Sequence, residues 1–175
     1  MEFTVHGPFK LPRQKGLIDR RPRAKRAFWE AVDKDEDALA SACGCYVYVV
    51  RAGKGMKPWY VGLTHKQTFR KECLTHHKIN IYNDAIANRK GNPMLFLLAK
   101  RTTQGRFAKA SIRKTADIRV LEGLLIGSAL DRNPGLGNVA RTRVLQGMIV
   151  PGFINSPKGR PGMAAIGLRK TLFKR

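Results

Sequence analysis

The chain has 175 residues, of which 34 are Lys or Arg and 12 are Asp or Glu, so its formal net charge at pH 7 is +22. This length suits one domain with a hydrophobic core and is too short for two large domains. No apolar run approaches the roughly 20 residues of a transmembrane helix, and the first residues lack the apolar core of a signal peptide. We therefore expect no membrane partner, and the excess of positive charge makes a nucleic acid the first partner to consider.

Three cysteines, Cys43, Cys45 and Cys73, make an odd number without the spacing of a disulfide framework. We therefore expect a reducing, intracellular location, in the cytoplasm. The same cysteines together with His76 or His77 are the alternative of a zinc site. The Cys-x-Cys pair is not followed by a second closely spaced pair, so this alternative is the less favoured one.

The N-terminal part of the chain divides into a basic arm and a helix. Residues 1–23 contain three prolines among scattered Arg and Lys and show little hydrophobic periodicity, which indicates an extended arm. Residues 24–39 place Phe28 and Val32 on one helical face between good helix formers, which predicts a helix. This segment also contains the only acidic patch of the sequence, residues 33–37.

Three strands and two helices are predicted over the middle of the chain. Residues 45–53 and 58–64 are dense in β-branched and aromatic residues and are separated by a glycine-containing loop, which predicts a hairpin. A capping threonine precedes residues 69–86, whose apolar residues recur at helical spacing. Residues 93–101 are nearly all apolar, as in a buried central strand, and residues 116–133 carry the apolar stripe of a helix.

Two polar residues in these helices call for a chemical explanation. Glu122 lies in an otherwise apolar stretch, and burying a bare carboxylate is expensive, so it must be paired or bind something. A metal ion is the functional interpretation. Arg70 lies near the start of its helix, where a cation works against the helix dipole. This placement suggests that Arg70 binds an anion such as a phosphate.

The motifs of the hairpin and these two residues resemble the GIY-YIG nuclease family. The paired strand motifs of that family stand here as Gly-Cys-Tyr at residues 44–46 and Tyr-Val-Gly at residues 60–62. An Arg on the next helix and a Glu on a later helix follow in the same order, as Arg70 and Glu122. The family's closing residues, a Pro, a Leu and an Asn, are matched by Pro134, Leu136 and Asn138.

The resemblance covers residues 43–139 and implies a fold as well as an activity. We expect an α/β (α+β) domain with a three-stranded, mainly antiparallel sheet flanked by helices, because the strands are too tightly linked for a doubly wound parallel sheet. Residues 1–42 would be the basic arm and its helix. Residues 140–175 contain no acidic residue and would form a basic, only partly regular extension.

The activity that the resemblance implies is metal-dependent hydrolysis of a phosphodiester bond, as by an endonuclease. Either Tyr46 or Tyr60 would accept the proton of the attacking water, and the choice between them stays open. A phenol with a pKa near about 10 needs nearby cations to do this at neutral pH. Arg70 would hold the nonbridging oxygens. Glu122 would be the only protein ligand of Mg²⁺ or Mn²⁺.

The chain departs from the family at Leu74, where the family often has a Tyr or His one turn after the Arg. His76, His77 or Tyr82 could replace that residue. His77 is preferred because it lies about two turns after the Arg, on a similar face of the helix. The residues expected to contact the substrate backbone are Lys66, Lys71, Lys78 and Asn138.

The expected partner is DNA, without a small-molecule cofactor. One active site cuts one strand at a time, so double-strand cleavage would require a homodimer or two visits. Two alternatives remain: a catalytically inactive nucleic-acid-binding module on the same fold, and a basic structural protein that binds RNA. The first predicts DNA binding without cleavage, and the second leaves the tyrosine motifs unexplained.

Overall fold

The computed structural model divides the chain into two compact units, residues 1–137 and residues 138–175. The second unit contains the helix α6 (Met163–Leu172). Each unit is described by itself. The structure describes residues 1–87, 90–112, 115–138, 142, 147–151 and 159–172.

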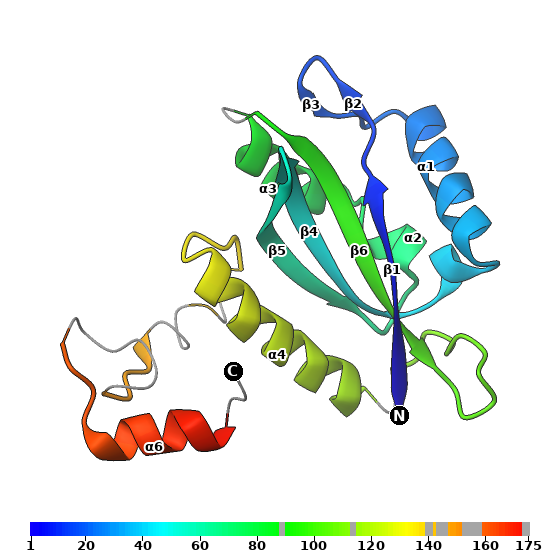
Figure 1. The fold of residues 1–175 in the computed structure, drawn as a ribbon. Helices are drawn as coiled ribbons and strands as arrows, with labels where there is room; N and C mark the ends of the chain where they lie inside the picture. Colours follow the sequence, from blue (N-terminus) through cyan, green and yellow to red (C-terminus); the bar gives the residue numbers. More distant parts are fainter. Residues whose placement is uncertain (88–89, 113–114, 139–141, 143–146, 152–158, 173–175) are drawn as a thin grey trace. The chain divides into compact units, whose positions relative to one another are not determined.

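A four-stranded antiparallel sheet forms the centre of the first unit (Figure 1). Its strands follow the order β1-β6-β4-β5, and every neighbouring pair is antiparallel. The strands are β1 (Glu2–Lys10), β6 (Asn92–Arg101), β4 (Gly44–Ala52) and β5 (Gly55–Thr64). The expectation of an antiparallel sheet flanked by helices is confirmed, but the expected number of three strands is wrong. Residues 92–101 are the central strand that their apolar sequence predicts.

The additional strand comes from the segment that was expected to be an extended arm. Residues 2–10 pair with β6, and a second small sheet joins β2 (Arg13–Gln14) to β3 (Leu17–Ile18). Both Leu11 and Ile18 are buried in the core. The prolines of this segment argue against a strand, but Pro is tolerated on an edge strand and at bulges. Strand β1 has such a register irregularity between His6 and Phe9.

The helices are close to the expected segments, with one division. The helix expected over residues 69–86 is two helices, α2 (Phe69–Glu72) and α3 (His76–Ile86). At the break, Thr75 has extended backbone angles, and the Lys25 ammonium donates to the Leu74 carbonyl at 2.8 Å. The other helices of this unit are α1 (Pro22–Asp35), the 3-10 turn η1 (Leu39–Ser41) and α4 (Ala116–Arg132). None of the described helices is long and apolar enough to cross a membrane.

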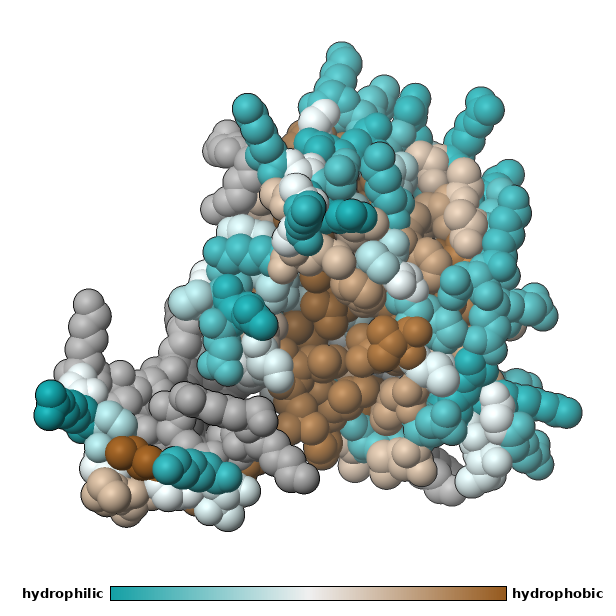
Figure 2. All heavy atoms as spheres, in the orientation of Figure 1, coloured by the Kyte–Doolittle hydropathy of each residue, from teal (hydrophilic) through white to brown (hydrophobic). Residues whose placement is uncertain are grey.

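The sheet separates two hydrophobic clusters. The larger cluster contains residues of α1, α2 and α3 together with Tyr46 and Tyr48 of β4. The smaller cluster lies against α4 and contains Cys45 of the same strand, because successive strand residues point to opposite faces. Figure 2 shows apolar side chains gathered in the middle of one face of the protein. On α4, the apolar side chains of Val120 and Leu124 are exposed. The homodimer expected from the sequence is not tested by these observations and stays a prediction.

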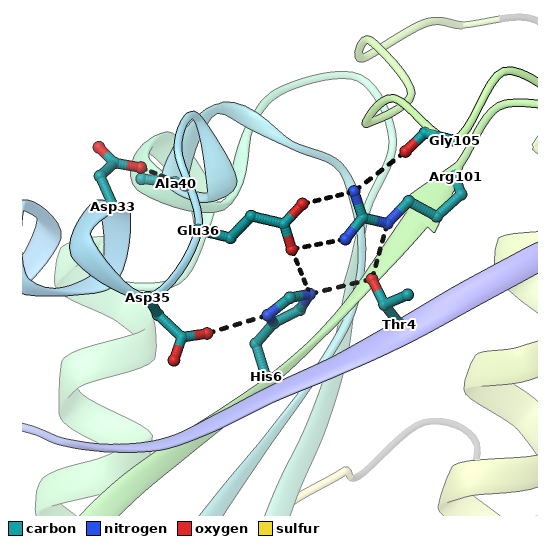
Figure 3. Close-up of polar contacts among 8 residues, drawn as sticks. All are labelled: Thr4, His6, Asp33, Asp35, Glu36, Ala40, Arg101 and Gly105. Carbon is teal, nitrogen blue, oxygen red and sulfur yellow. Dashed lines mark hydrogen bonds and ion pairs between the residues drawn. The ribbon is translucent and has the colours of Figure 1, made fainter.

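A polar network ties β1, the end of α1 and β6 together (Figure 3). The guanidinium of Arg101 donates to both carboxylate oxygens of Glu36, at 2.7 and 2.6 Å, and to the Thr4 hydroxyl at 2.9 Å. The His6 ring is hydrogen-bonded to the Asp35 carboxylate at 3.0 Å and lies 3.7 Å from Glu36. The hydrogen bonds from Arg101 hold the pKa of Glu36 below its usual range.

This lowered pKa predicts an acid-dependent loss of stability. A carboxyl group with a depressed pKa stabilises the folded state above its unfolded pKa of about 4.3, and this contribution is lost as the pH falls through the folded value. Glu36→Gln should lower the Tm at pH 7 by up to about 2–4 °C, since a partly exposed pair contributes at most about 1 kcal/mol. In thermal unfolding at pH 7 and pH 3, this difference in Tm should shrink at pH 3. A difference that stays constant would contradict the assignment.

Candidate functional site

The two tyrosine motifs face each other across the β4–β5 hairpin. Tyr46 pairs with Gly62 and Tyr48 pairs with Tyr60. Since the members of each antiparallel pair point to the same side of the sheet and residues two apart share a face, all of them lie on the face covered by α2 and α3. The hairpin register therefore brings both candidate bases to one side, with ring centroids 6.2 Å apart for Tyr46 and Tyr60.

The glycine of the second motif, Gly62, lies where there is no room for a side chain. A Cβ atom at Gly62 would collide with the ring end and the hydroxyl of Tyr46, with the Cε2 atom 2.7 Å away. The Tyr46 ring therefore lies across Gly62, and its hydroxyl end reaches over β5. Because β5 is an edge strand of the sheet, this contact brings the tyrosine cluster toward that edge.

A lysine and a glutamate complete the surroundings of Tyr60. The Lys78 ammonium donates to the Tyr60 hydroxyl at 2.5 Å and also lies 4.7 Å from the centre of its ring. Glu72 lies 3.7 Å from the same ammonium and accepts a hydrogen bond from Gln67. Lys78, expected to bind the substrate backbone, thus contacts a candidate base, and Glu72 is a neighbour that the sequence did not indicate.

The two tyrosines differ in their access to solvent. Tyr46 is fully buried, and its hydroxyl has no hydrogen-bond partner among the described residues. Burial, and then Tyr82, raise the pKa of Tyr46 well above its usual value. Tyr82 is also buried and stacks on Tyr48 with ring centroids 4.2 Å apart. Tyr60 is only partly buried, so it is the more accessible of the two candidate bases.

Arg70 binds an anion, but the anion belongs to the protein. Its guanidinium lies 2.6 Å from the Asp33 carboxylate of α1, and the two side chains are 43% and 26% exposed. The other Asp33 oxygen accepts the backbone N–H of Ala40 at 2.8 Å, which fixes the carboxylate. An ion pair this exposed contributes at most about 1 kcal/mol. A stronger anion such as a phosphate can therefore compete with Asp33 for Arg70.

Glu122 lies on the other side of the sheet from the tyrosines. It is half-buried on α4, and burial together with the charge of Glu122 raises the pKa of Cys45 to about 12. The Cys45 thiol donates to the Ile118 carbonyl at 3.3 Å, so this part of α4 packs directly on β4. Glu122 and the tyrosine cluster thus approach the same hairpin from opposite faces.

The α4 helix and the turn that follows it reach the outer edge of β5. The Asn133 amide donates to the Pro58 carbonyl at 2.7 Å, and the Gly137 N–H donates to the Trp59 carbonyl at 2.9 Å. A Cβ atom at Gly137 would be 3.8 Å from the Tyr60 ring. Asn138, the next residue, belongs to the second unit.

The candidates to replace the Tyr or His that the family often has at Leu74 lie at different places in the structure. Leu74 itself is buried. His76 and His77 are exposed in the first turn of α3, and His76 lies 3.0 Å from the guanidinium of Arg20. Tyr82 is the candidate that lies with the tyrosine cluster, 6.2 Å from Tyr60 between ring centroids. The remaining expected substrate contacts, Lys66 and Lys71, are exposed.

The zinc alternative finds no support among the described residues. Cys43 and Cys45 lie in the cluster beside α4, whereas Cys73 is buried in the core on the opposite face. All three cysteines are free, and no group of three or more His, Cys, Asp or Glu side chains is placed to hold a metal ion in the part of the chain that the structure describes. A site with one carboxylate ligand is not of this kind, and the half-buried Glu122 suits it chemically.

These contacts define a mixed α+β protein with a cluster of Tyr, Lys and Glu on the central hairpin of an antiparallel sheet. Comparisons with protein-family models, with curated proteins and with solved structures found no match. The choice of a function therefore rests on the residues themselves.

The unpartnered hydroxyl of Tyr46 predicts an unusual effect on stability. Burying a polar group without a partner costs about 1–3 kcal/mol, so Tyr46→Phe should stabilise the protein by about 1 kcal/mol in urea unfolding. The matched control is Tyr48→Phe, which removes a hydrogen bond of 3.1 Å to the Tyr82 carbonyl and should destabilise by about 1 kcal/mol. Equal destabilisation by both variants would show that the Tyr46 hydroxyl is satisfied.

Proposed function

We propose that the protein is a metal-dependent DNA endonuclease of the GIY-YIG type, which hydrolyses phosphodiester bonds. The observation that carries the proposal is the contact between the Lys78 ammonium and the Tyr60 hydroxyl, on a hairpin whose Tyr46 and Gly62 interlock. A cation against a partly accessible phenol is the arrangement that a tyrosine base needs. The ammonium stabilises the phenolate, which is the form of Tyr60 that can accept a proton.

Tyr60 is the better candidate for the base. In the proposed reaction, the oxygen of a water molecule forms a bond to phosphorus and its proton passes to the phenolate oxygen of Tyr60. The bond from phosphorus to the leaving oxygen breaks, and that oxygen keeps the electron pair and takes up a proton from the solvent. Tyr46 is poorly suited to accept this proton because its burial disfavours the charged phenolate. In this proposal Tyr46 packs against Gly62 and sets the position of the hairpin.

Arg70 would bind the nonbridging oxygens after exchanging Asp33 for the phosphate. A guanidinium presents two parallel donors to a phosphate, and its contact with Asp33 is exposed enough to be displaced. The preformed ion pair also holds the guanidinium at one place before the substrate arrives. His77 and Lys71, exposed on the neighbouring helices, would contact the flanking backbone.

Glu122 would hold the metal ion. Mg²⁺ and Mn²⁺ accept a single carboxylate when water and phosphate oxygens supply the other ligands, so one half-buried glutamate fits either ion. Bound there, the ion would neutralise charge on the leaving oxygen. A substrate lying along the edge strand β5 could meet Tyr60 from one face and α4 from the other. The net charge of +22 supports a polyanionic substrate.

A second candidate is a binding module without catalysis on the same fold. The Arg70–Asp33 ion pair favours it, because an arginine already neutralised by a carboxylate stabilises less of the charge that grows on the phosphate during hydrolysis. This candidate predicts DNA binding that needs no metal and leaves the DNA intact.

A plasmid-nicking assay tests the proposed activity directly. Supercoiled plasmid should be nicked in Mg²⁺ or Mn²⁺ and left intact in EDTA, and Glu122→Gln should abolish nicking because it removes the metal ligand. The control is Glu30→Gln, which removes an exposed carboxylate from α1 and should cut like the parent protein. Plasmid that is shifted on a gel but uncut would favour the binding module. Equal cutting by the Glu122→Gln protein would overturn the metal assignment.

Replacing each tyrosine separately tests which one is the base. Tyr60→Phe should lower the rate of nicking by about 10²–10⁴-fold, the usual contribution of a general base. Tyr46→Phe keeps the ring across Gly62 and should lower the rate by a smaller factor. The rates are measured under single-turnover conditions on the same plasmid. A larger loss for Tyr46→Phe would reverse the assignment.

A further inference from the structure

The first helix carries its charges in the opposite order to the one that stabilises a helix. Its first turn has no acidic residue, and Arg23, Lys25 and Arg26 lie near its N-terminus. Apart from Glu30, its acidic residues lie at the other end, within residues 33–37, where Lys34 is the one basic residue. Cations near the N-terminus and anions near the C-terminus each oppose the helix dipole, by about 0.3–1 kcal/mol. Both groups of charges therefore need another explanation.

The acidic end of α1 is explained by contacts inside the protein. Asp33 and Glu36 form ion pairs with Arg70 and Arg101, both at 2.6 Å, and Asp35 is hydrogen-bonded to His6 at 3.0 Å. These carboxylates fasten the helix to α2, β1 and β6. The end of α1 is thus an anionic surface that binds polar side chains of three other elements.

The basic end is not balanced in this way. Arg21 forms an ion pair with Asp19 at 2.7 Å. In the described part of the chain, no carboxylate forms an ion pair with Arg20, Arg23 or Arg26, and all three are exposed. Arg23 and Arg26 are three residues apart, a spacing at which like charges on a helix repel each other. An exposed row of cations that costs the helix stability suggests an anionic partner.

The position of this row relative to the tyrosine cluster is fixed by hydrogen bonds. The Arg20 guanidinium contacts His76 at 3.0 Å and donates to Asn80 at 2.7 Å, both on α3. The Lys25 ammonium reaches the carbonyl just before α3. The same helix carries Lys78, which contacts Tyr60. The first turn of α3 therefore lies between the arginine row and the proposed base.

We propose that Arg20, Arg23 and Arg26 form a docking surface for the phosphate backbone of double-stranded DNA, beside the site at Tyr60. This proposal rests on the proposed function for the choice of DNA. The surface lies outside the part of the chain that resembles the nuclease family, so residues 1–42 would add substrate contacts to those of the catalytic region. Phosphate contacts of this kind position a duplex without reading its sequence.

The test compares two variants with the same loss of charge. One replaces Arg20, Arg23 and Arg26 by Gln, and the control replaces three exposed cations located elsewhere, Lys34, Lys54 and Arg106, by Gln. Binding of a labelled 20-base-pair duplex is measured by fluorescence anisotropy in EDTA, at several salt concentrations between 50 and 200 mM. Because EDTA prevents metal-dependent cleavage, the result does not depend on whether the protein is a nuclease. A cooperative thermal unfolding transition in each variant establishes that both are folded.

Each lost phosphate contact reduces the slope of log K against log salt by about 0.9. The arginine variant should therefore show a slope that is smaller by about 2–3 and bind at least tenfold more weakly than the parent at low salt, while the control changes the slope by less than about one unit. Equal losses in both variants, or no loss in the arginine variant, would overturn the docking surface. Tighter parental binding to an RNA duplex of the same sequence would overturn the choice of DNA. A plasmid left uncut, with the slope change present, would refute only the nuclease.

Discussion

The close packing of Tyr46 on Gly62 is the constraint on which the candidate site depends. It fixes the direction of the Tyr46 ring across β5, and the hairpin register then places Tyr60 on the same face. From that face Tyr60 meets Lys78 of α3, and Lys78 meets Glu72 at the end of α2. Any side chain at residue 62 would push the ring away and disturb the hairpin at its centre. The second motif therefore needs its glycine for space, without any requirement for an unusual backbone angle.

Several of the few carboxylates of this protein bind cations of the protein itself. The end of α1 binds arginines of α2 and β6, and Glu72 lies beside Lys78. With 12 acidic residues against 34 basic ones, such pairing leaves most cations without an internal anion. The excess destabilises the compact state by self-repulsion, and a polyanion relieves it. The same ion pairs that hold α1 in place thus leave its other end cationic.

Hydrophobic periodicity and composition predicted the helices and strands that the local sequence determines. The features that were not predicted depend on contacts between residues far apart in the chain. The hairpin, the central strand over residues 93–101 and both long helices follow from periodicity and composition. Strand β1 could not be found in this way, because its pairing with β6 joins residues more than 80 positions apart. At the break between α2 and α3, the Leu74 carbonyl likewise accepts a hydrogen bond from Lys25 of another helix. Among the site residues, Arg70 was expected to bind an anion such as a phosphate, which stays a prediction, and nothing in the sequence indicated its ion pair with Asp33.

The proposed reaction requires groups from both faces of the sheet, and only an edge strand allows this. In a central strand, such as β4, both sides of the backbone are covered by neighbouring strands, so a ligand can reach residues of one face only. At β5, the turn after α4 binds the outer carbonyls of Pro58 and Trp59 and covers that part of the edge. The next stretch of this edge along β5 contains Tyr60 and Gly62. A substrate there would lie between the α3 side, with its lysine and tyrosine, and the α4 side, with its glutamate. The arrangement of strands therefore determines which edge the proposed chemistry can use.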